Sequence, residues 1–298
     1  MFEEFKNAFQ RYNNGHVQLI IINLAVFVVM GVIMVITKIG GLEGLWTGIH
    51  EQFQIPARLS EFISRPWTLL TYMFMHDLSG ILHILFNMLI MYWFGKLFVE
   101  YLGSDKLIAV YLLGGIAGGI FYLLAYNTIP FYVSQAEAYR IGMVGASASV
   151  NAIVVATATL VPNYTFFLLF IGPVRIKYIA AVFVFLSFLG SVGNNAGGNI
   201  AHLGGALMGF IYMKQLQSGI NWGGWITVTI DWFKDLFKEK PKVKVSYRKD
   251  RGASTRSTTA EKGYTQEEID RILDKISEGG YESLTKDEKE KLFNASKK

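Results

Sequence analysis

Long apolar stretches alternate with short polar ones over the first 217 residues of the chain. A helix that crosses a hydrocarbon core of about 30 Å needs about 20 predominantly apolar residues. Backbone groups inside lipid must be hydrogen-bonded within the structure, which favours helices over open strands. Windows of this kind predict an all-α membrane protein with six transmembrane helices, near residues 17–39, 80–100, 106–126, 142–162, 175–192 and 199–217.

The segments between these helices carry signals of the membrane surface. Residues 40–76 form a long first loop that we expect to lie partly in the interface, because aromatic side chains suit the headgroup layer. Those aromatics are Trp46, Phe53, Phe62 and Trp67. Residues 170–173 (Phe-Ile-Gly-Pro) predict a turn between the fourth and fifth helices, since proline cannot continue a helix.

The pattern changes after residue 217 and divides the chain into four parts. Residues 1–217 form the membrane domain, and residues 218–240 form an interfacial segment containing Trp222, Trp225 and Trp232. Residues 241–262 are polar and unpatterned, which predicts a flexible linker. Residues 263–298 predict a small cytoplasmic helical hairpin, because Thr265–Glu268 and Thr285–Glu288 both have the capping-box pattern.

Charge and composition agree with this division. Of 28 Lys and Arg residues, 11 lie in residues 1–232 and 17 lie in the last 66 residues. Basic residues near membrane helices mark the cytoplasmic side, so we expect both termini in the cytoplasm. Because the basic residues are explained by this position, we expect no nucleic-acid partner. The absence of cysteine excludes disulfides, cysteine-ligated metals and thiol catalysis. The N-terminus lacks a signal-peptide pattern. We also predict no metal site and no cofactor.

Polar residues in three of the expected spans are the candidates for chemistry, because such groups are costly in lipid. His83 and Asn87 lie four residues apart on one face of span 2, Ser147 follows Gly145 at the start of span 4, and His202 begins span 6. These three spans run in the same direction, and each polar group lies within about two turns of its helix start. At 1.5 Å per residue, all four groups share a layer roughly 5–10 Å below the outer surface.

The histidine of span 6 lies on the face with the smallest side chains. His202, Gly205 and Gly209 follow helical spacing, and small faces let membrane helices pack closely. A partner helix carrying Ser147 would then bring a hydroxyl beside an imidazole, which could act as its base. The side chains of His83 and Asn87 and the backbone N–H of Ser147 are available to stabilise an oxyanion.

Each of these features has a structural alternative when it stands alone. A Gly-x-Ser sequence or a glycine pair usually means helix packing, and a single histidine in a span can be a helix–helix hydrogen bond. A transporter lined by His83, Asn87 and His202 would spread polar groups through the bilayer, whereas span 3 is largely apolar. The coincidence of these groups at one depth favours a catalytic site.

The chain resembles the rhomboid family in three motifs that keep the family's order and spacing. The motifs are Tyr72–His76 with His83–Asn87, then Gly145–Ala148, then Ala201–Gly209. The resemblance implies a six-helix rhomboid-like bundle with a Ser147–His202 dyad that has no third acid. It also implies that His83 and Asn87 are oxyanion-hole groups and that Gly145 is the family's glycine before the serine.

Three departures from the family pattern accompany this resemblance. The Trp-Arg pair of the first loop reads Arg65-Pro66-Trp67, and Ala148 stands where glycine is common. Asn151 occupies the position of an aromatic that stacks on the base, so it could orient His202 by a hydrogen bond or leave the dyad looser.

The sequence therefore predicts an intramembrane serine endopeptidase that cleaves transmembrane or membrane-proximal segments of membrane proteins. The alternative is a weak or inactive rhomboid-like chaperone or adaptor that binds membrane helices. The expected partners are the lipid bilayer, membrane-protein substrates and, for the tail hairpin, an unknown cytoplasmic partner or a second copy. The expected location is a bacterial plasma membrane.

Overall fold

A computed structural model describes residues 11–78, 80–138, 142–237 and 266–295. The chain divides into two compact units, Met1–Glu239 and Lys240–Lys298. The expected linker, residues 241–262, lies outside the described residues. The two units are described separately.

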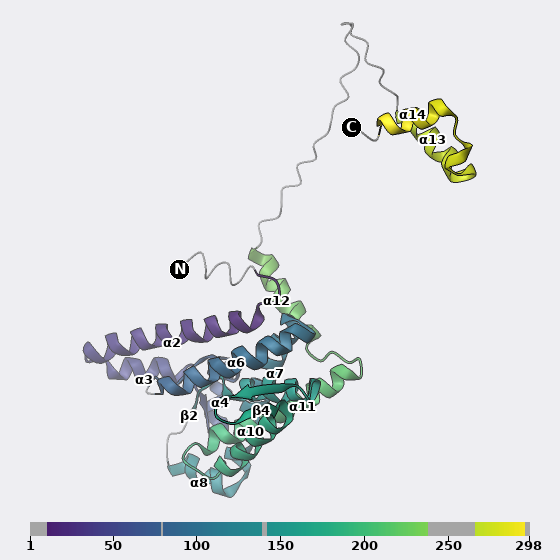
Figure 1. Cartoon of the computed structure of the whole chain (residues 1–298). Helices are drawn as coiled ribbons and strands as arrows, with labels where there is room; N and C mark the ends of the chain where they lie inside the picture. Colours follow the sequence, from purple (N-terminus) through teal and green to yellow (C-terminus); the bar gives the residue numbers. More distant parts are fainter. Residues whose placement is uncertain (1–10, 79, 139–141, 238–265, 296–298) are drawn as a thin grey trace. The chain divides into compact units, whose positions relative to one another are not determined.

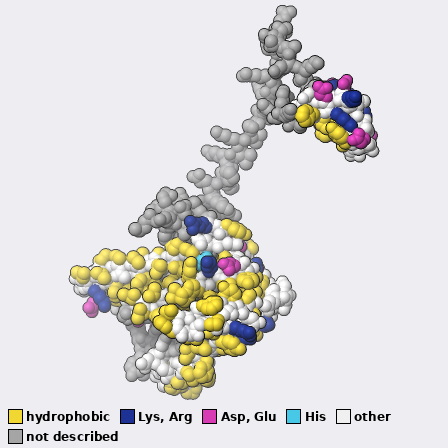
Figure 2. All heavy atoms as spheres, in the orientation of Figure 1, with side chains coloured by type: hydrophobic (Ala, Val, Ile, Leu, Met, Phe, Trp, Pro, Cys, Tyr) yellow, Lys and Arg dark blue, Asp and Glu magenta, His cyan; other side chains and the backbone are white. Residues whose placement is uncertain are grey.

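The first unit is a bundle of helices that correspond to the six expected ones (Figure 1). They are α2 (Gly15–Ile39), α6 (Ile81–Leu102), α7 (Ser104–Thr128), α9 (Ser147–Leu160), α10 (Ile176–Gly190) and α11 (Ala196–Gln217). Among the described residues, three helices, α2, α6 and α7, are long and apolar enough to cross a membrane, and α9 and α10 are shorter apolar helices. Apolar side chains cover much of the visible face of this unit, as expected of a surface in contact with lipid (Figure 2).

The centre of the bundle is formed by α7, α9 and α11, which pack on one another through small residues. A Cβ added at Gly205 would overlap the backbone of Ala148, and a Cβ at Gly209 would overlap the backbone of Ala152. A Cβ at Gly118 of α7 would lie 2.6 Å from the Cβ of the same Ala148 and 2.8 Å from the Ala201 carbonyl oxygen of α11. Close backbone approach therefore depends on glycine at these positions.

The first loop is built from short elements tied together by polar contacts. It contains α3 (Glu43–Glu51), β1 (Ile55–Pro56), α4 (Leu59–Ser64), α5 (Thr68–Thr71) and the 3-10 helix η1 (Tyr72–Phe74). Arg65 donates to the Glu51 carbonyl at 2.6 Å and to the Glu61 carboxylate at 3.0 Å, while the Trp67 indole donates to the Gln52 carbonyl at 2.9 Å. The arginine of the altered Trp-Arg motif therefore holds this loop together.

Buried hydrogen bonds fasten the end of the first loop to the bundle. The Tyr111 hydroxyl donates to the Met73 carbonyl at 2.7 Å, and the Tyr72 hydroxyl donates to the Gly115 carbonyl. Asn23 of α2 donates to the Tyr111 hydroxyl at 3.1 Å. Because these groups are buried, the bonds satisfy polar atoms that would otherwise be costly.

The fourth helix begins later than the sequence predicted. Residues 142–146, expected to be helical, are not: β2 (Gly142–Met143) pairs with β1, and Gly145 has a φ of +137°, which favours glycine and is incompatible with a helix. The helix α9 therefore starts at Ser147. Between α7 and β2, α8 (Pro130–Ala138) forms an additional short helix.

The connection between α9 and α10 contains the predicted turn but also a hairpin that the sequence did not predict. Strands β3 (Thr165–Leu168) and β4 (Gly172–Arg175) pair antiparallel. Phe170, at the tip, has a φ of +69° and is 96% exposed. After α11, α12 (Gly224–Phe237) buries Ile226 and exposes Trp225 and Trp232, as an interfacial helix would.

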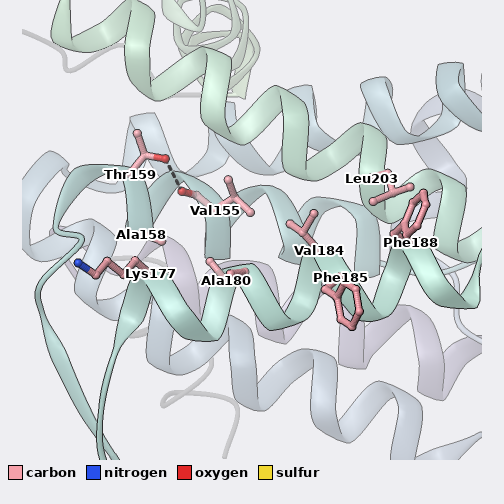
Figure 3. Close-up of a pocket in the computed structure, with 10 residues that line it drawn as sticks. Val155, Ala158, Thr159, Lys177, Ala180, Val184, Phe185, Phe188 and Leu203 are labelled. Atoms are coloured by element: carbon pink, nitrogen blue, oxygen red, sulfur yellow. Dashed lines mark hydrogen bonds between the residues drawn. The ribbon is translucent and has the colours of Figure 1, made fainter.

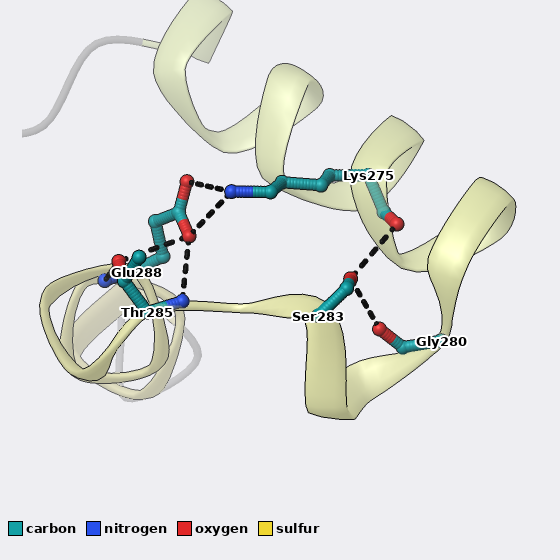
Figure 4. Close-up of polar contacts among 5 residues, drawn as sticks. All are labelled: Lys275, Gly280, Ser283, Thr285 and Glu288. Carbon is teal, nitrogen blue, oxygen red and sulfur yellow. Dashed lines mark hydrogen bonds and ion pairs between the residues drawn. The ribbon is translucent and has the colours of Figure 1, made fainter.

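The second unit contains α13 (Gln266–Gly279), the 3-10 helix η2 (Tyr281–Ser283) and α14 (Lys286–Ala295). The capping box at the start of α14 is formed: the Thr285 N–H donates to the Glu288 carboxylate at 2.7 Å, and Lys275 binds the same carboxylate at 2.9 Å (Figure 4). The first residue of the other expected box, Thr265, lies outside the described residues. Ile272 and Leu284 are the buried apolar residues among those described in this unit.

Candidate active site

The two candidate catalytic side chains meet between α9 and α11. Gly145 donates its N–H to the Tyr72 carbonyl at 3.0 Å, and its left-handed backbone turns the chain into α9. Ser147 is the first residue of that helix, so its backbone N–H is one of the donors without a partner inside the helix. The His202 Nε2 lies 2.7 Å from the Ser147 Oγ, within the distance that proton transfer requires.

A second hydroxyl lies on the other side of the imidazole. The His202 Nδ1 is 3.3 Å from the Oγ of Ser187, a residue of α10 that is 5% exposed. The Ser187 hydroxyl also donates to the Phe183 carbonyl one turn earlier, at 2.9 Å. Ser187 was missed in the sequence, although a serine in an otherwise apolar stretch of a membrane helix is the same signal that identified the other candidates.

The two candidate oxyanion groups lie on α6, next to the serine. A Cβ built on Gly145 would be 3.5 Å from the Ser147 Oγ and 3.7 Å from the His83 Nε2, so both polar atoms border this glycine. The Asn87 amide donates to the His83 carbonyl at 3.0 Å, and its side chain is buried. His76, also buried, faces His83 with ring centroids 6.5 Å apart.

The candidate groups line a common cavity of about 330 Å³. It is bordered by residues of α6, α9, α10 and α11, including His83, Asn87, Ser147, Asn151, Ser187 and His202. His83 also borders a more polar cavity of about 530 Å³ with Asp77, Gln135 and Asn195 in its lining. The two cavities share His83 in their linings, so the larger cavity places polar groups that can bind water next to the candidate site.

Asn151 does not contact His202 through a hydrogen bond described in the structure. Its amide donates to the Ser147 carbonyl at 2.9 Å, and its buried Oδ1 has no partner among the described residues. Of the two alternatives for Asn151, an orienting hydrogen bond to His202 is therefore not among the described contacts. The described hydrogen-bond partner of the His202 Nδ1 is instead the Ser187 hydroxyl of α10.

Another groove of the first unit shares no lining residue with the cavity of the candidate site. It measures about 610 Å³ and runs between α9, α10 and α11, with Lys177 near one end and Phe188 near the other (Figure 3). Its lining is almost entirely apolar, which is typical of a surface that contacts lipid. Within the described part of the chain, no group of three or more His, Cys, Asp or Glu side chains could hold a metal ion.

Comparison with known proteins assigns the family. The rhomboid domain matches residues 64–217, which include the end of the first loop and every helix of the candidate site. Together with the helical bundle, this match shows that the chain belongs to the rhomboid family and is a multi-pass integral membrane protein. A family of unknown function, DUF6576, matches residues 256–298, which include the tail hairpin.

Curated relatives support the same assignment. RHOMBOID-like protein 12, mitochondrial, of Arabidopsis thaliana is 31% identical over 190 residues, covering 60% of this chain and 56% of that protein. Rhomboid-like protein 16, chloroplastic, of the same plant is 26% identical over 67% of this chain and 62% of its own length. Presenilin-associated rhomboid-like protein A, mitochondrial, of Danio rerio is 28% identical over 45% of this chain and 34% of its own length.

The similarity to these relatives is partial. The chain spans less than two thirds of the length of each of them. Their names refer to mitochondria and chloroplasts, so they give no support to the expectation of a bacterial plasma membrane.

Proposed function

We propose that this protein is an intramembrane serine endopeptidase that cleaves transmembrane or membrane-proximal segments of other membrane proteins. The observation that carries the proposal is the 2.7 Å contact between the Ser147 Oγ and the His202 Nε2 inside a bundle of apolar helices. A serine and a histidine at this distance form a nucleophile and its base. Membership of the rhomboid family supports the same function.

The reaction proceeds through an acyl-enzyme. His202 accepts the Ser147 proton as the Oγ attacks the carbonyl carbon of the scissile peptide bond. The resulting oxyanion is stabilised by the Ser147 N–H with the side chains of His83 and Asn87. His202 then gives its proton to the leaving amine, the peptide bond breaks, and a water molecule activated by His202 hydrolyses the ester.

The lengths of the helices support a site below the membrane surface. We propose that α2, α6, α7, α9, α10 and α11 are the six spans, with both termini in the cytoplasm. The 14 residues of α9 extend about 21 Å, against a hydrocarbon core of about 30 Å. If the C-terminal end of α9 reaches the cytoplasmic surface, Ser147 lies about 9 Å below the outer surface, where water can enter through the polar cavity.

The substrates that fit this site are membrane helices whose ends can unwind. A regular helix has its carbonyl groups hydrogen-bonded, so a scissile carbonyl must be released before Ser147 can attack it. The tail hairpin lies outside the matched rhomboid domain, and we propose that it docks a cytoplasmic partner or a second copy.

A fluorophosphonate probe tests the proposal directly. The purified protein should be labelled, and it should cleave a reporter protein with one transmembrane helix. Ser147→Ala should abolish both activities, and His202→Ala should be as severe, because the two groups act as a unit. Retained cleavage in either variant would rule out the dyad, while absence of labelling and cleavage in the folded wild type would favour the helix-binding adaptor.

A further inference from the structure

The imidazole of His202 can act as a base only in one of its two neutral forms. The Nε2 must carry the free electron pair that accepts the Ser147 proton, so the hydrogen must reside on Nδ1. In enzymes with a catalytic triad, a carboxylate accepts a hydrogen bond from Nδ1–H and thereby fixes this tautomer. The atom that lies beside the Nδ1 of His202 is instead the Ser187 Oγ, at 3.3 Å.

The second hydrogen bond of Ser187 determines which way the first one points. Its hydroxyl has one hydrogen, and the Phe183 carbonyl, 2.9 Å away, can only accept. With the hydrogen directed to this carbonyl, the Oγ presents lone pairs to His202 and must accept from Nδ1–H. The alternative, in which Ser187 donates to Nδ1, would give up the shorter contact and leave Nε2 protonated.

The buried surroundings of Ser187 strengthen its two hydrogen bonds. The side chain of Ser187 is 5% exposed, so water competes little for either bond. Its helix, α10, packs against both α9 and α11, which carry the serine and the histidine. Asn151 lines the same cavity and donates its amide to the Ser147 carbonyl, whereas the described hydrogen-bond partner of Nδ1 is Ser187.

We propose that Ser187 is a positioning residue that holds His202 in the Nδ1–H tautomer and aims its Nε2 at Ser147. The chain of bonds runs from the Phe183 carbonyl through the Ser187 hydroxyl and the imidazole to the nucleophile. Ser187 touches no reacting atom. The inference rests on the proposed function for its effect on rate, but its effect on the tautomer does not depend on any activity.

Two substitutions at this position separate the hydrogen bond from packing. Ser187→Ala removes the acceptor and little volume, and it should lower kcat by roughly ten- to hundredfold. A single neutral hydrogen bond accounts for about tenfold, and a share of molecules in the inactive tautomer accounts for the rest. KM should stay within about a factor of two, since Ser187 acts through His202. Ser187→Thr retains the hydroxyl and should stay within about threefold of the wild type.

The matched control is Ser191 at the end of the same helix. Its hydroxyl donates to the Phe188 carbonyl at 2.7 Å, and the residue is buried, but none of the described hydrogen bonds joins it to His202. Ser191→Ala therefore removes the same group, with the same kind of local bond, and should leave kcat unchanged.

The tautomer itself is read by ¹⁵N NMR of histidine-labelled protein in detergent, at a pH where the imidazole is neutral. The signal that disappears in His202→Gln identifies His202. The wild type should show protonation at Nδ1, and Ser187→Ala should show a shift toward protonation at Nε2. An unchanged tautomer in Ser187→Ala, an equal loss of kcat in Ser191→Ala, or no recovery in Ser187→Thr would overturn the proposal. If the wild type cleaves nothing, the proposed function fails, while the NMR comparison still decides the role of Ser187.

Discussion

Replacing Gly205 by alanine should slow the proposed enzyme by about tenfold to a hundredfold without changing any reacting group. A Cβ at this position would lie 2.8 Å from the Ala148 carbonyl carbon and closer still to its oxygen, whereas ordinary contact begins at 3.4 Å. The obstacle is backbone, which cannot rotate away, so α11 must retreat from α9 by at least about 0.6 Å. His202 lies one turn before Gly205 on the same helix and moves with it.

This displacement of α11 is large compared with the tolerance of the contact between Ser147 and His202. A retreat of this size would lengthen the 2.7 Å contact between the His202 Nε2 and the Ser147 Oγ to about 3.3 Å or more, beyond the reach of efficient proton transfer. A misplacement of about 1 Å can cost a factor of about 10² in rate. We therefore expect Gly205→Ala to lower kcat/KM by about tenfold to a hundredfold, with a loss of about 1–3 kcal/mol in stability from overpacking.

The assay is cleavage of the reporter membrane protein, with thermal unfolding in detergent measured alongside. The control is Gly31→Ala in α2, where the nearest atom to an added Cβ, of Leu78, is 4.0 Å away. Alanine is the better helix former, so the control should be neutral or slightly stabilising. Full activity and an unchanged Tm in Gly205→Ala would show that α11 does not pack on α9 through this face.

Three further predictions concern the oxyanion site and the tail. Asn87→Ala should lower kcat by about 10² in the same assay. This is the lower end of the range for loss of one oxyanion donor, because His83 and a backbone N–H remain. Unchanged rates in both Asn87→Ala and His83→Ala would show that the oxyanion binds elsewhere. Truncation after residue 240 should leave cleavage within about threefold, and a loss above tenfold with a folded membrane unit would show that the tail supports the bundle. The capping bonds from Thr285 and the nearby Lys275 lower the pKa of Glu288 to about 2 from an ordinary 4.5. These bonds should therefore support the helicity of residues 240–298 fully above about pH 4.5. Their support should be lost as the pH falls toward 2. Circular dichroism checks this, and Glu288→Gln should flatten the dependence.

Much of the bundle could be predicted from the sequence, because lipid imposes a simple rule on each segment separately. A stretch of about 20 apolar residues must become a helix, whatever its neighbours do. The six expected helices appear close to their predicted positions, and the turn at residues 170–173 appears as well. The capping box at Thr285 is similarly local, since its two bonds join residues three apart.

The start of α9 depended on contacts that sequence patterns do not show. Residues 142–146 are apolar enough to continue a helix, but Gly142 and Met143 pair with a strand of the first loop, more than eighty residues earlier. Gly145 then adopts a backbone that ends the strand and opens the helix at Ser147. The position of Ser147, the candidate nucleophile, at a helix N-terminus is therefore determined by tertiary structure.

The candidate site likewise has one part that the sequence predicted and one part that only the tertiary structure determined. Polarity within apolar helices was sufficient to single out Ser147, His202, His83 and Asn87, because an isolated polar group in lipid is costly wherever it occurs. Which groups meet depends on how far each helix is rotated and shifted against its neighbours. That packing brings Ser187 of α10 to the Nδ1 of His202 in α11, a contact between two helices that local spacing does not encode.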